Sequence, residues 1–139
     1  MKKFVSIHDN AQIGKNLIID NFSSIHDNVI IGDNCWIGSN VTIYPGARIG
    51  SNCQIFPGAV ISAIPQDLKF KDEDTTTIIG DNVIIRECVT INRGTIYHNK
   101  TTVGDNCFLM AYSHVAHDCI LKNNVIIANG VAIAGHVEI

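Results

Sequence analysis

The stretch VIIGDNCWIGSNVTI, residues 29–43, repeats the same pattern every six positions. A large aliphatic residue stands at Ile31, Ile37 and Ile43, and a smaller, mostly apolar residue stands two places before each of them. Because the two residues are two positions apart, both side chains lie on one face of a short strand, while the residue between them points the other way. Three residues then remain to turn the chain before the next strand begins.

The same six-residue phase extends over nearly the whole chain, which makes it an internal repeat. The positions that carry isoleucine, or in a few cases valine or leucine, are 7, 13, 19, 25, 31, 37, 43, 49, 55, 61, 79, 85, 91, 103, 109, 115, 121, 127, 133 and 139. Burying one such side chain contributes on the order of 1.5–3 kcal/mol, so this set predicts a substantial core.

The third residue after each repeat isoleucine indicates a sharp corner. In the first part of the chain this residue is Asn10, Asn16, Asn28, Asn34, Asn40, Gly46, Asn52 or Gly58, and Phe22 is the exception. Gly and Asn tolerate the left-handed backbone conformation that such a bend requires. A helix needs apolar spacings of three and four, and a hairpin sheet needs longer strands. The sequence therefore predicts an all-β parallel β-helix of about seven coils, each of three strands and about 18 residues.

Composition and charge exclude several classes of protein. The formal net charge of −3 gives no general electrostatic reason to bind nucleic acid. The five cysteines lack the paired spacings of zinc ribbons and redox motifs, and no long apolar run follows the N-terminus. We therefore expect one β-helix domain over residues 1–139 that is cytoplasmic, has reduced thiols and has no membrane span. Four cysteines fall at the small inward position and are expected in the core: Cys35, Cys53, Cys107 and Cys119.

Two stretches interrupt the repeat. In the segment 64–74, Asp67 and Glu73 occupy positions where the core requires an aliphatic residue, and Pro65 lies close by. A second interruption covers residues 96–100. Both are predicted to be loops that project from the prism. Loops on a rigid scaffold are common places for binding residues, although a purely solvated loop fits this composition equally well.

Apolar side chains at outward positions suggest that part of the prism is covered. These residues are Ile18, Ile30, Trp36, Val60, Ile84, Phe108, Ile120 and Ile126. Such a number is too large for an isolated prism in water. A triangular prism packs naturally about a threefold axis, so we expect a homotrimer.

The segment 112–119 places two histidines and a carboxylate in a repeat that elsewhere uses Gly, Asp and Asn at its turns. His117 falls at a corner, where we expect it to be exposed, and Asp118 follows it and could orient a ring somewhere in the trimer. His136 comes 19 residues later, one coil plus one residue, and is expected beside the same edge. His114 points outward from a strand, which suggests a supporting, substrate-binding role. A neutral histidine can remove a proton from a hydroxyl group, so His117 is the candidate base.

Four blocks of sequence carry a more specific resemblance. They are PQDLKF at 65–70, IRECVTINRGT at 85–95, HVAHDC at 114–119 and AGH at 134–136. Together with the repeat, they resemble the UDP-N-acetylglucosamine O-acyltransferases of lipid A biosynthesis, a family of left-handed β-helices. The resemblance covers the whole chain, in order and with matching spacing.

The resemblance implies an activity and an assembly. It implies transfer of a (R)-3-hydroxyacyl chain from acyl carrier protein to the 3-hydroxyl of UDP-N-acetylglucosamine. It further implies a homotrimer with active sites in clefts between neighbouring prisms, and it implies no metal and no redox cofactor. Because the family continues with further coils and a C-terminal helical domain, we expect this chain to be a fragment that binds weakly and turns over poorly.

The resemblance also assigns residues. It places the general base at His117, the sugar-contacting aspartate at Asp67, and further substrate contacts at Lys69 and His136. The chain departs from the family at Asn92, where the family often has a histidine. An amide can form a hydrogen bond to a sugar but cannot titrate, so Asn92 is predicted to bind substrate without taking part in proton transfer.

Three other interpretations stay open. One is a related hexapeptide N-acyltransferase that acts on an amino-sugar nucleotide. Another is a zinc carbonic anhydrase of the same fold, with His114, His117 and His136 as ligands, although no spacing favours it. The third is a purely structural β-helix, and the departures from the regular corner around His117 argue against it.

Overall fold

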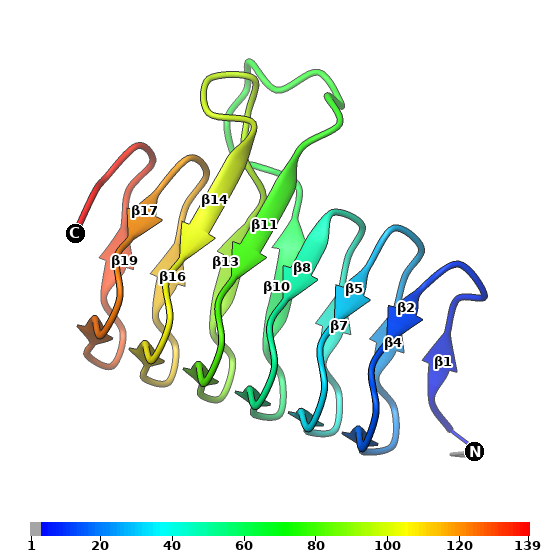
Figure 1. The fold of residues 1–139 in the computed structure, drawn as a ribbon. Helices are drawn as coiled ribbons and strands as arrows, with labels where there is room; N and C mark the ends of the chain where they lie inside the picture. Colours follow the sequence, from blue (N-terminus) through cyan, green and yellow to red (C-terminus); the bar gives the residue numbers. More distant parts are fainter. Residues whose placement is uncertain (1–3) are drawn as a thin grey trace.

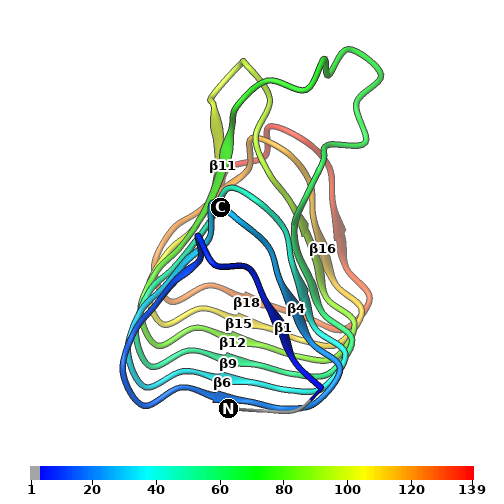
Figure 2. The ribbon, with the colours of Figure 1, turned by 90° about the vertical axis from the view of Figure 1, so that its right-hand side faces the viewer.

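The computed structural model describes residues 4–139 and confirms the all-β prediction (Figure 1). The described residues form nineteen short parallel strands, most of them two residues long, in three sheets. Each turn of the chain adds one strand to each sheet, so the coil has three sides (Figure 2). In this part of the chain, no helix has the length and apolar character needed to cross a membrane.

The three sheets contain every third strand of the chain. The first sheet contains β1 (Ser6–Ile7), β4 (Ser24–Ile25), β7 (Thr42–Ile43), β10 (Val60–Ala63), β13 (Thr90–Asn92), β16 (His114–Val115) and β19 (Ala132–Ile133). The second sheet contains β2 (Gln12–Ile13), β5 (Ile30–Ile31), β8 (Ala47–Ile49), β11 (Thr76–Ile79), β14 (Lys100–Val103) and β17 (Ile120–Leu121). The third sheet contains β3 (Ile18–Ile19), β6 (Trp36–Ile37), β9 (Gln54–Ile55), β12 (Ile84–Ile85), β15 (Phe108–Leu109) and β18 (Ile126–Ile127).

The register stacks each repeat residue on the equivalent residue of the next coil. Ile7 pairs with Ile25, and Ile25 pairs with Ile43, so neighbouring strands of one sheet are 18 residues apart where no loop intervenes. Ile43 and Ile61 have no exposed surface, and the four cysteines predicted to lie in the core are buried. The repeat residues from Ile19 to Ile133 therefore form the continuous core that the sequence predicts, whereas Ile7, Ile13 and Ile139, in the end coils, are exposed.

The predicted corners from Asn16 to Gly58 adopt the left-handed conformation, whereas Asn10, in the first coil, does not have a positive φ. Asn16, Asn34 and Asn52 have φ angles of 57°, 59° and 60°. Phe22, the exception in the corner pattern, adopts the same conformation with a φ of 70°, and its ring stacks on Phe4. The bend is therefore imposed by the coil, and Asn is the residue that accommodates it at low cost.

One corner is further tied together by side chains that link successive coils. Asp81 Oδ1 accepts a hydrogen bond from Ser51 N at 2.8 Å, and Asp105 Oδ1 accepts one from Asp81 N at 2.8 Å. Asp33 and Asn123 extend this ladder on either side. These bonds satisfy backbone donors that the short strands leave unpaired at the turn.

Both predicted loops leave the prism at the same edge. The first loop, residues 64–75, connects β10 to β11, and the second loop, residues 93–99, connects β13 to β14. In Figures 1 and 2 the two loops rise side by side from the edge where the first and second sheets meet. β16 and β19 of the first sheet end at this same edge, which brings residues from four coils together.

Candidate active site

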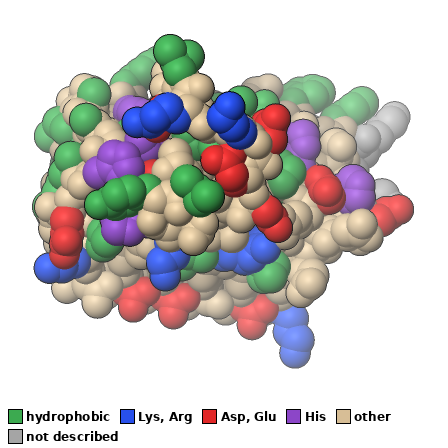
Figure 3. Space-filling model, turned by 90° about the horizontal axis from the view of Figure 1, so that it is seen from above, with side chains coloured by type: hydrophobic (Ala, Val, Ile, Leu, Met, Phe, Trp, Pro, Cys, Tyr) green, Lys and Arg blue, Asp and Glu red, His purple; other side chains and the backbone are tan. Residues whose placement is uncertain are grey.

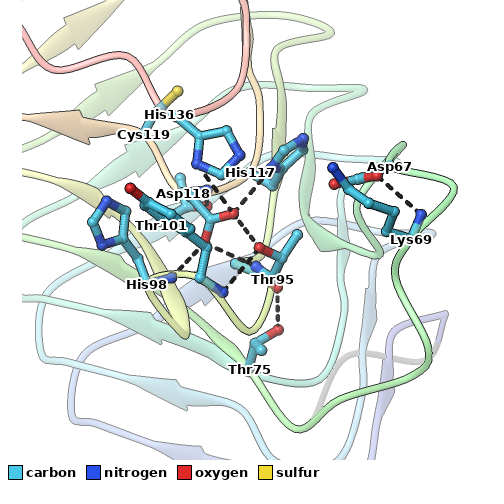
Figure 4. A network of polar contacts seen from close by, with 12 residues as sticks. Asp67, Lys69, Thr75, Thr95, His98, Thr101, His117, Asp118, Cys119 and His136 are labelled. Carbon is cyan, nitrogen blue, oxygen red and sulfur yellow. Dashed lines mark hydrogen bonds and ion pairs between the residues drawn. The ribbon is translucent and has the colours of Figure 1, made fainter.

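His117 and Asp118 lie at the edge that carries the loops, directly after β16. Asp118 is the corner residue, with a φ of 60°, and His136 is the equivalent corner residue of the next coil, with a φ of 65°. The backbone N of His136 donates a hydrogen bond to the carbonyl of His117 at 3.1 Å. The predicted proximity of His117 and His136 is therefore confirmed by their geometry (Figure 4).

His117 is less exposed than its corner position predicts. Only 13% of the surface of its side chain is exposed to solvent, and the side chain of Asp118 has no exposed surface. One cause is the next coil, because a Cβ atom at Gly135 would lie 2.5 Å from His117 Cε1. The expectation of an exposed His117 is wrong, because its ring packs into the space that the absent side chain of Gly135 leaves.

The carboxylate of Asp118 accepts four hydrogen bonds (Figure 4). Its Oδ1 accepts from the backbone N of Thr95 at 2.9 Å and of His98 at 3.2 Å. Its Oδ2 accepts from the Thr95 hydroxyl and lies 3.0 Å from His117 Nδ1. Burial alone would raise the pKa of Asp118, but the hydrogen bonds from Thr95 and His117 outweigh it and hold the pKa below its usual value. Asp118 is therefore ionised at neutral pH.

An ionised Asp118 fixes the tautomer of His117. A carboxylate accepts hydrogen bonds only, so Nδ1 of His117 must carry the proton that faces it. In the neutral ring, Nε2 then has a free lone pair and can accept a proton from a hydroxyl group. The sequence predicted only that Asp118 could orient a ring. The structure shows that this ring is that of His117 and that its Nδ1 faces the carboxylate.

A cavity of about 510 Å³ opens beside this pair. Both loops and the last corner line it, with Asp67, Lys69, Phe70, Glu73, Thr95, Ile96, Tyr97 and His136. The rings of His117 and His136 meet edge to face with their centres 4.9 Å apart, and the ring centre of Tyr97 lies 4.8 Å from that of His136. Figure 3 shows histidine side chains gathered at the C-terminal end of this surface, with basic and acidic side chains next to them.

The cavity brings together three of the predicted substrate-binding residues: Asp67, Lys69 and His136. Asp67 shapes its own loop, since its Oδ1 accepts a hydrogen bond from Lys69 N and its carbonyl accepts one from Phe70 N, both at 2.9 Å. This tight turn presents the carboxylate and the ammonium group from adjacent positions. The arrangement suits a polar ligand with both hydroxyl and anionic groups.

Asn92 and His114 lie outside the cavity, on the first sheet. Asn92 ends β13 and is only 3% exposed, and its Oδ1 is buried without a hydrogen-bond partner among the described residues. His114 is half-buried in β16, with its Nδ1 2.7 Å from the hydroxyl of Thr90. Burial lowers the pKa of His114, which favours the neutral ring. The structure does not bring either residue together with Asp67.

Sequence reasoning assigned no role to Thr95, Tyr97 or Gly135. Thr95 and Tyr97 belong to the second loop, which has no periodicity from which a contact to Asp118 or His136 could be inferred. Gly135 could have been found from the sequence. It lies between Ala134 and His136 in the AGH block, and it follows His117 by 18 residues, the length of one coil. A glycine in the coil next to His117 indicates that the His117 ring needs the space that a side chain would take.

His117, Asp118 and His136 place ligand atoms within 4.8 Å of one another, a separation that a metal ion could bridge. Each carboxylate oxygen of Asp118 already accepts two hydrogen bonds, three of the four from the second loop. A cation would have to displace these donors. His114, the third ligand of the zinc interpretation, is bonded to Thr90 instead. His117, Asp118 and His136 therefore fit proton transfer and do not fit a resident metal ion.

Two segments, residues 28–63 and 100–135, match the bacterial transferase hexapeptide family, described as six repeats. These segments make up more than half of the chain. The three-sided coil of the structure is built from these hexapeptide repeats. The chain belongs to the bacterial transferase hexapeptide family.

Curated relatives carry a more specific name. A protein of Campylobacter concisus is 54% identical over 87 residues, which are 61% of this chain and 33% of the relative. One of Synechocystis is 56% identical over 85 residues, which are 61% of this chain and 31% of the relative. Both are named acyl-[acyl-carrier-protein]--UDP-N-acetylglucosamine O-acyltransferase.

Solved structures agree over nearly the whole chain. The UDP-N-acetylglucosamine acyltransferase LpxA of Bacteroides fragilis superposes with a TM-score of 0.98 at 51% identity, covering 99% of this chain and 54% of that one. The enzyme of Francisella novicida gives 0.95 at 42% identity, covering 99% and 50%. These likenesses confirm the left-handed β-helix and the resemblance inferred from the four blocks. This chain spans about a third of the length of the curated relatives and about half of that of the solved structures.

Proposed function

We propose that this chain carries the acyl-transfer site of an enzyme of lipid A biosynthesis. In this proposal, a (R)-3-hydroxyacyl chain moves from acyl carrier protein to the 3-hydroxyl of UDP-N-acetylglucosamine. The observation that carries the proposal is the His117 ring, held by Asp118 at Nδ1 and placed next to a cavity of about 510 Å³. The names of the relatives at 54% and 56% identity support the same substrates.

The chemistry follows from the free nitrogen of His117. Nε2 removes the proton of the acceptor hydroxyl while the oxygen attacks the carbonyl carbon of the thioester. A carbon–oxygen bond forms, the carbon–sulfur bond breaks, and the proton on Nε2 passes to the departing thiolate of the carrier. Asp118 stabilises the imidazolium that exists between these steps.

The residues around the cavity bind the acceptor in this proposal. Asp67 and Lys69, on the turn of the first loop, contact sugar hydroxyls and the anionic part of the nucleotide. His136 contacts the substrate from the last corner. We also propose that His114 and Asn92 bind substrate from the first sheet. The buried Oδ1 of Asn92 has no hydrogen-bond partner among the described residues, and a substrate donor would satisfy it.

Three further features belong to the proposed function. The reaction needs no metal and no redox cofactor, because the base and its orienting carboxylate supply the proton transfer. The enzyme acts as a homotrimer in the cytoplasm, where acyl carrier protein is available. The exposed isoleucines of the third sheet, with Ile18 56% and Ile126 65% exposed, support the trimer.

The decisive experiment is an acyl-transfer assay with a set of 3-hydroxyacyl carrier proteins and two acceptors. UDP-N-acetylglucosamine and its 3-amino analogue separate an O-acyltransferase from an N-acyltransferase. We expect ester formation with UDP-N-acetylglucosamine and a loss of it in His117→Ala. Amide formation alone, or ester formation that is independent of His117, would refute the proposal.

A further inference from the structure

The buried threonine Thr95 contacts Asp118 at Oδ2, the carboxylate oxygen that faces Nδ1 of His117. Its hydroxyl bonds Asp118 Oδ2, the same atom that His117 Nδ1 contacts at 3.0 Å. Its backbone N bonds the other carboxylate oxygen at 2.9 Å. One residue of the second loop therefore holds both oxygens of the carboxylate that orients the base.

The direction of the hydroxyl proton is set by a neighbour. The backbone N of Tyr97 donates a hydrogen bond to Thr95 Oγ1 at 3.2 Å, so this oxygen acts as an acceptor on that side. Its single proton is then available for Asp118, which can only accept. The hydroxyl of Thr95 is therefore a directed donor to Asp118 Oδ2.

The position of Thr95 is itself fixed from the first loop. Thr75, the last residue of that loop, donates its hydroxyl proton to the carbonyl of Gly94, and Gly94 N bonds the carbonyl of Thr76 at 3.1 Å. A Cβ at Gly94 would lie 2.2 Å from Lys100 N, so the chain is closely packed here. The loop that carries Asp67 and the carboxylate behind His117 therefore share one rigid frame.

We propose that Thr95 is a positioning residue that holds Asp118, and through it the ring of His117, in the geometry required for proton transfer. The kinetic part of this proposal rests on the proposed acyl transfer. With the hydroxyl in place, Oδ2 lies between two donors and the carboxylate cannot rotate away from Nδ1. Without it, the carboxylate keeps its backbone donors on Oδ1 but loses the bond that fixes Oδ2, and His117 loses its fixed orientation.

Three variants test this role in the full chain. Thr95→Val removes the hydroxyl and keeps the shape and the backbone donor, while Thr95→Ser restores the hydroxyl. Thr77→Val is the matched control: Thr77 is also a buried threonine, and its hydroxyl bonds Ser62 Oγ at 3.0 Å without contacting Asp118. All three are compared with the wild type in thermal unfolding, so that a loss of fold is visible.

In the acyl-transfer assay we expect Thr95→Val to lower kcat by about 10- to 100-fold with a KM for the acceptor within about twofold of the wild type. Thr95→Ser should recover most of kcat, and Thr77→Val should stay near the wild type. A rise in KM with an unchanged kcat would overturn the proposal, because it would show direct substrate binding. Equal losses in Thr95→Val and Thr77→Val would overturn it too, because they would show a general effect on folding.

A measurement that does not depend on turnover separates this proposal from the proposed function. Proton NMR detects the Nδ1–H of His117 as a slowly exchanging downfield signal while it is bonded to Asp118. We expect the signal in the wild type and Thr95→Ser, and its loss in Thr95→Val. A signal that persists unchanged in Thr95→Val would refute the positioning role. A wild type that shows the Thr95-dependent signal but transfers no acyl group would support the positioning role and refute the proposed function.

Discussion

At the scale of single residues, Asp118 is a charged side chain with no exposed surface, and its hydrogen bonds come from two separate parts of the chain. A buried carboxylate is unfavourable unless donors compensate for the lost water. Here Thr95 and His98 supply them from the second loop, and His117 supplies the last from its neighbouring position. The histidine and the carboxylate therefore act as one unit, and losing either should reduce turnover more than binding.

His117→Ala should lower the turnover of the complete enzyme by at least about 100-fold, because the group that accepts the hydroxyl proton is lost. The fold should persist, since the ring is at a corner and outside the core. His26→Ala is a suitable control, because His26 follows β4 far along the same edge, where it packs on Tyr44. Steady-state kinetics and thermal unfolding of both variants check this, and near wild-type turnover in His117→Ala would refute the assignment.

Gly135→Ala should reduce turnover with little loss of stability, because the new Cβ would lie 2.5 Å from the His117 ring and displace it. Gly130→Ala provides the contrast, since Gly130 has a φ of 70° and open space around it. That variant should lose roughly 1 kcal/mol of stability through backbone strain and keep its activity. Kinetics and chemical denaturation on both variants would show whether the two effects separate as expected.

The low pKa of Asp118 predicts a dependence of stability on pH. Burial raises this pKa, but the hydrogen bonds outweigh it and leave it below the ordinary value of 3.8. A carboxyl group of this kind stabilises the fold fully above pH 3.8, and the contribution is lost as the pH falls below that value toward the folded-state pKa. Asp118→Asn should be less stable at neutral pH and show a shallower loss in acid.

Chemical denaturation at several pH values between about 5 and about 3 measures this slope. Asp74→Asn is the control, because Asp74 lies in the first loop with an exposed side chain. We expect this control to keep the slope of the wild type. An Asp118→Asn variant with the same acid slope as the wild type would contradict the assigned role of the carboxylate.

At the scale of the elements, the repeat predicted every strand of the coil, because each one follows from the aliphatic residue at its inward position. It also predicted the corners from Asn16 to Gly58. It indicated that Asp118 could orient a ring, but not that this ring is that of His117. The repeat could not predict the four hydrogen bonds of Asp118, because Thr95 lies 23 residues away in a loop whose conformation has no periodic signal. The burial of Asn92 was also not predicted, because its substrate-binding role came from the resemblance and not from its place in the strand.

The asparagine corners allow a direct test of why that residue recurs. Asn82 has a φ of 57°, so Asn82→Ala should lower the free energy of unfolding by about 1 kcal/mol, while Asn82→Gly should have little effect. Both variants remove the same side chain, and only alanine is strained in this conformation. Denaturant titration of the pair checks the prediction, and equal losses would show that the side chain, not the backbone, matters.

At the scale of the whole molecule, the outward row of the third sheet is the most apolar of the three faces. It contains Ile18, Trp36, Gln54, Ile84, Phe108 and Ile126. The outward positions of the second sheet include Gln12, Arg48 and Thr102 instead. We therefore expect the third sheet to lie in the interface of the trimer.

Light scattering should find a trimer for the wild type, and Ile126→Glu should dissociate it, because a charge would be buried in the interface. Ile30→Glu, on the second sheet, is the matched control, since Ile30 is also an exposed outward isoleucine. It should leave the trimer intact. A monomeric wild type at micromolar concentration would refute the trimer, and dissociation by Ile30→Glu alone would assign the interface to another face.

The hydrogen bonds between coils have a mechanical consequence. They run along the axis of the prism, and the ends of the described chain lie at opposite ends of that axis (Figure 1). A force pulling on the two ends loads the bonds of one coil at a time, so the prism should unwind stepwise, each step releasing about 18 residues. Where the loops lock two coils to Asp118, the force needed for the next step should rise. Under tension, the coils around His117 and Asp118 would therefore be the last part of the prism to unwind.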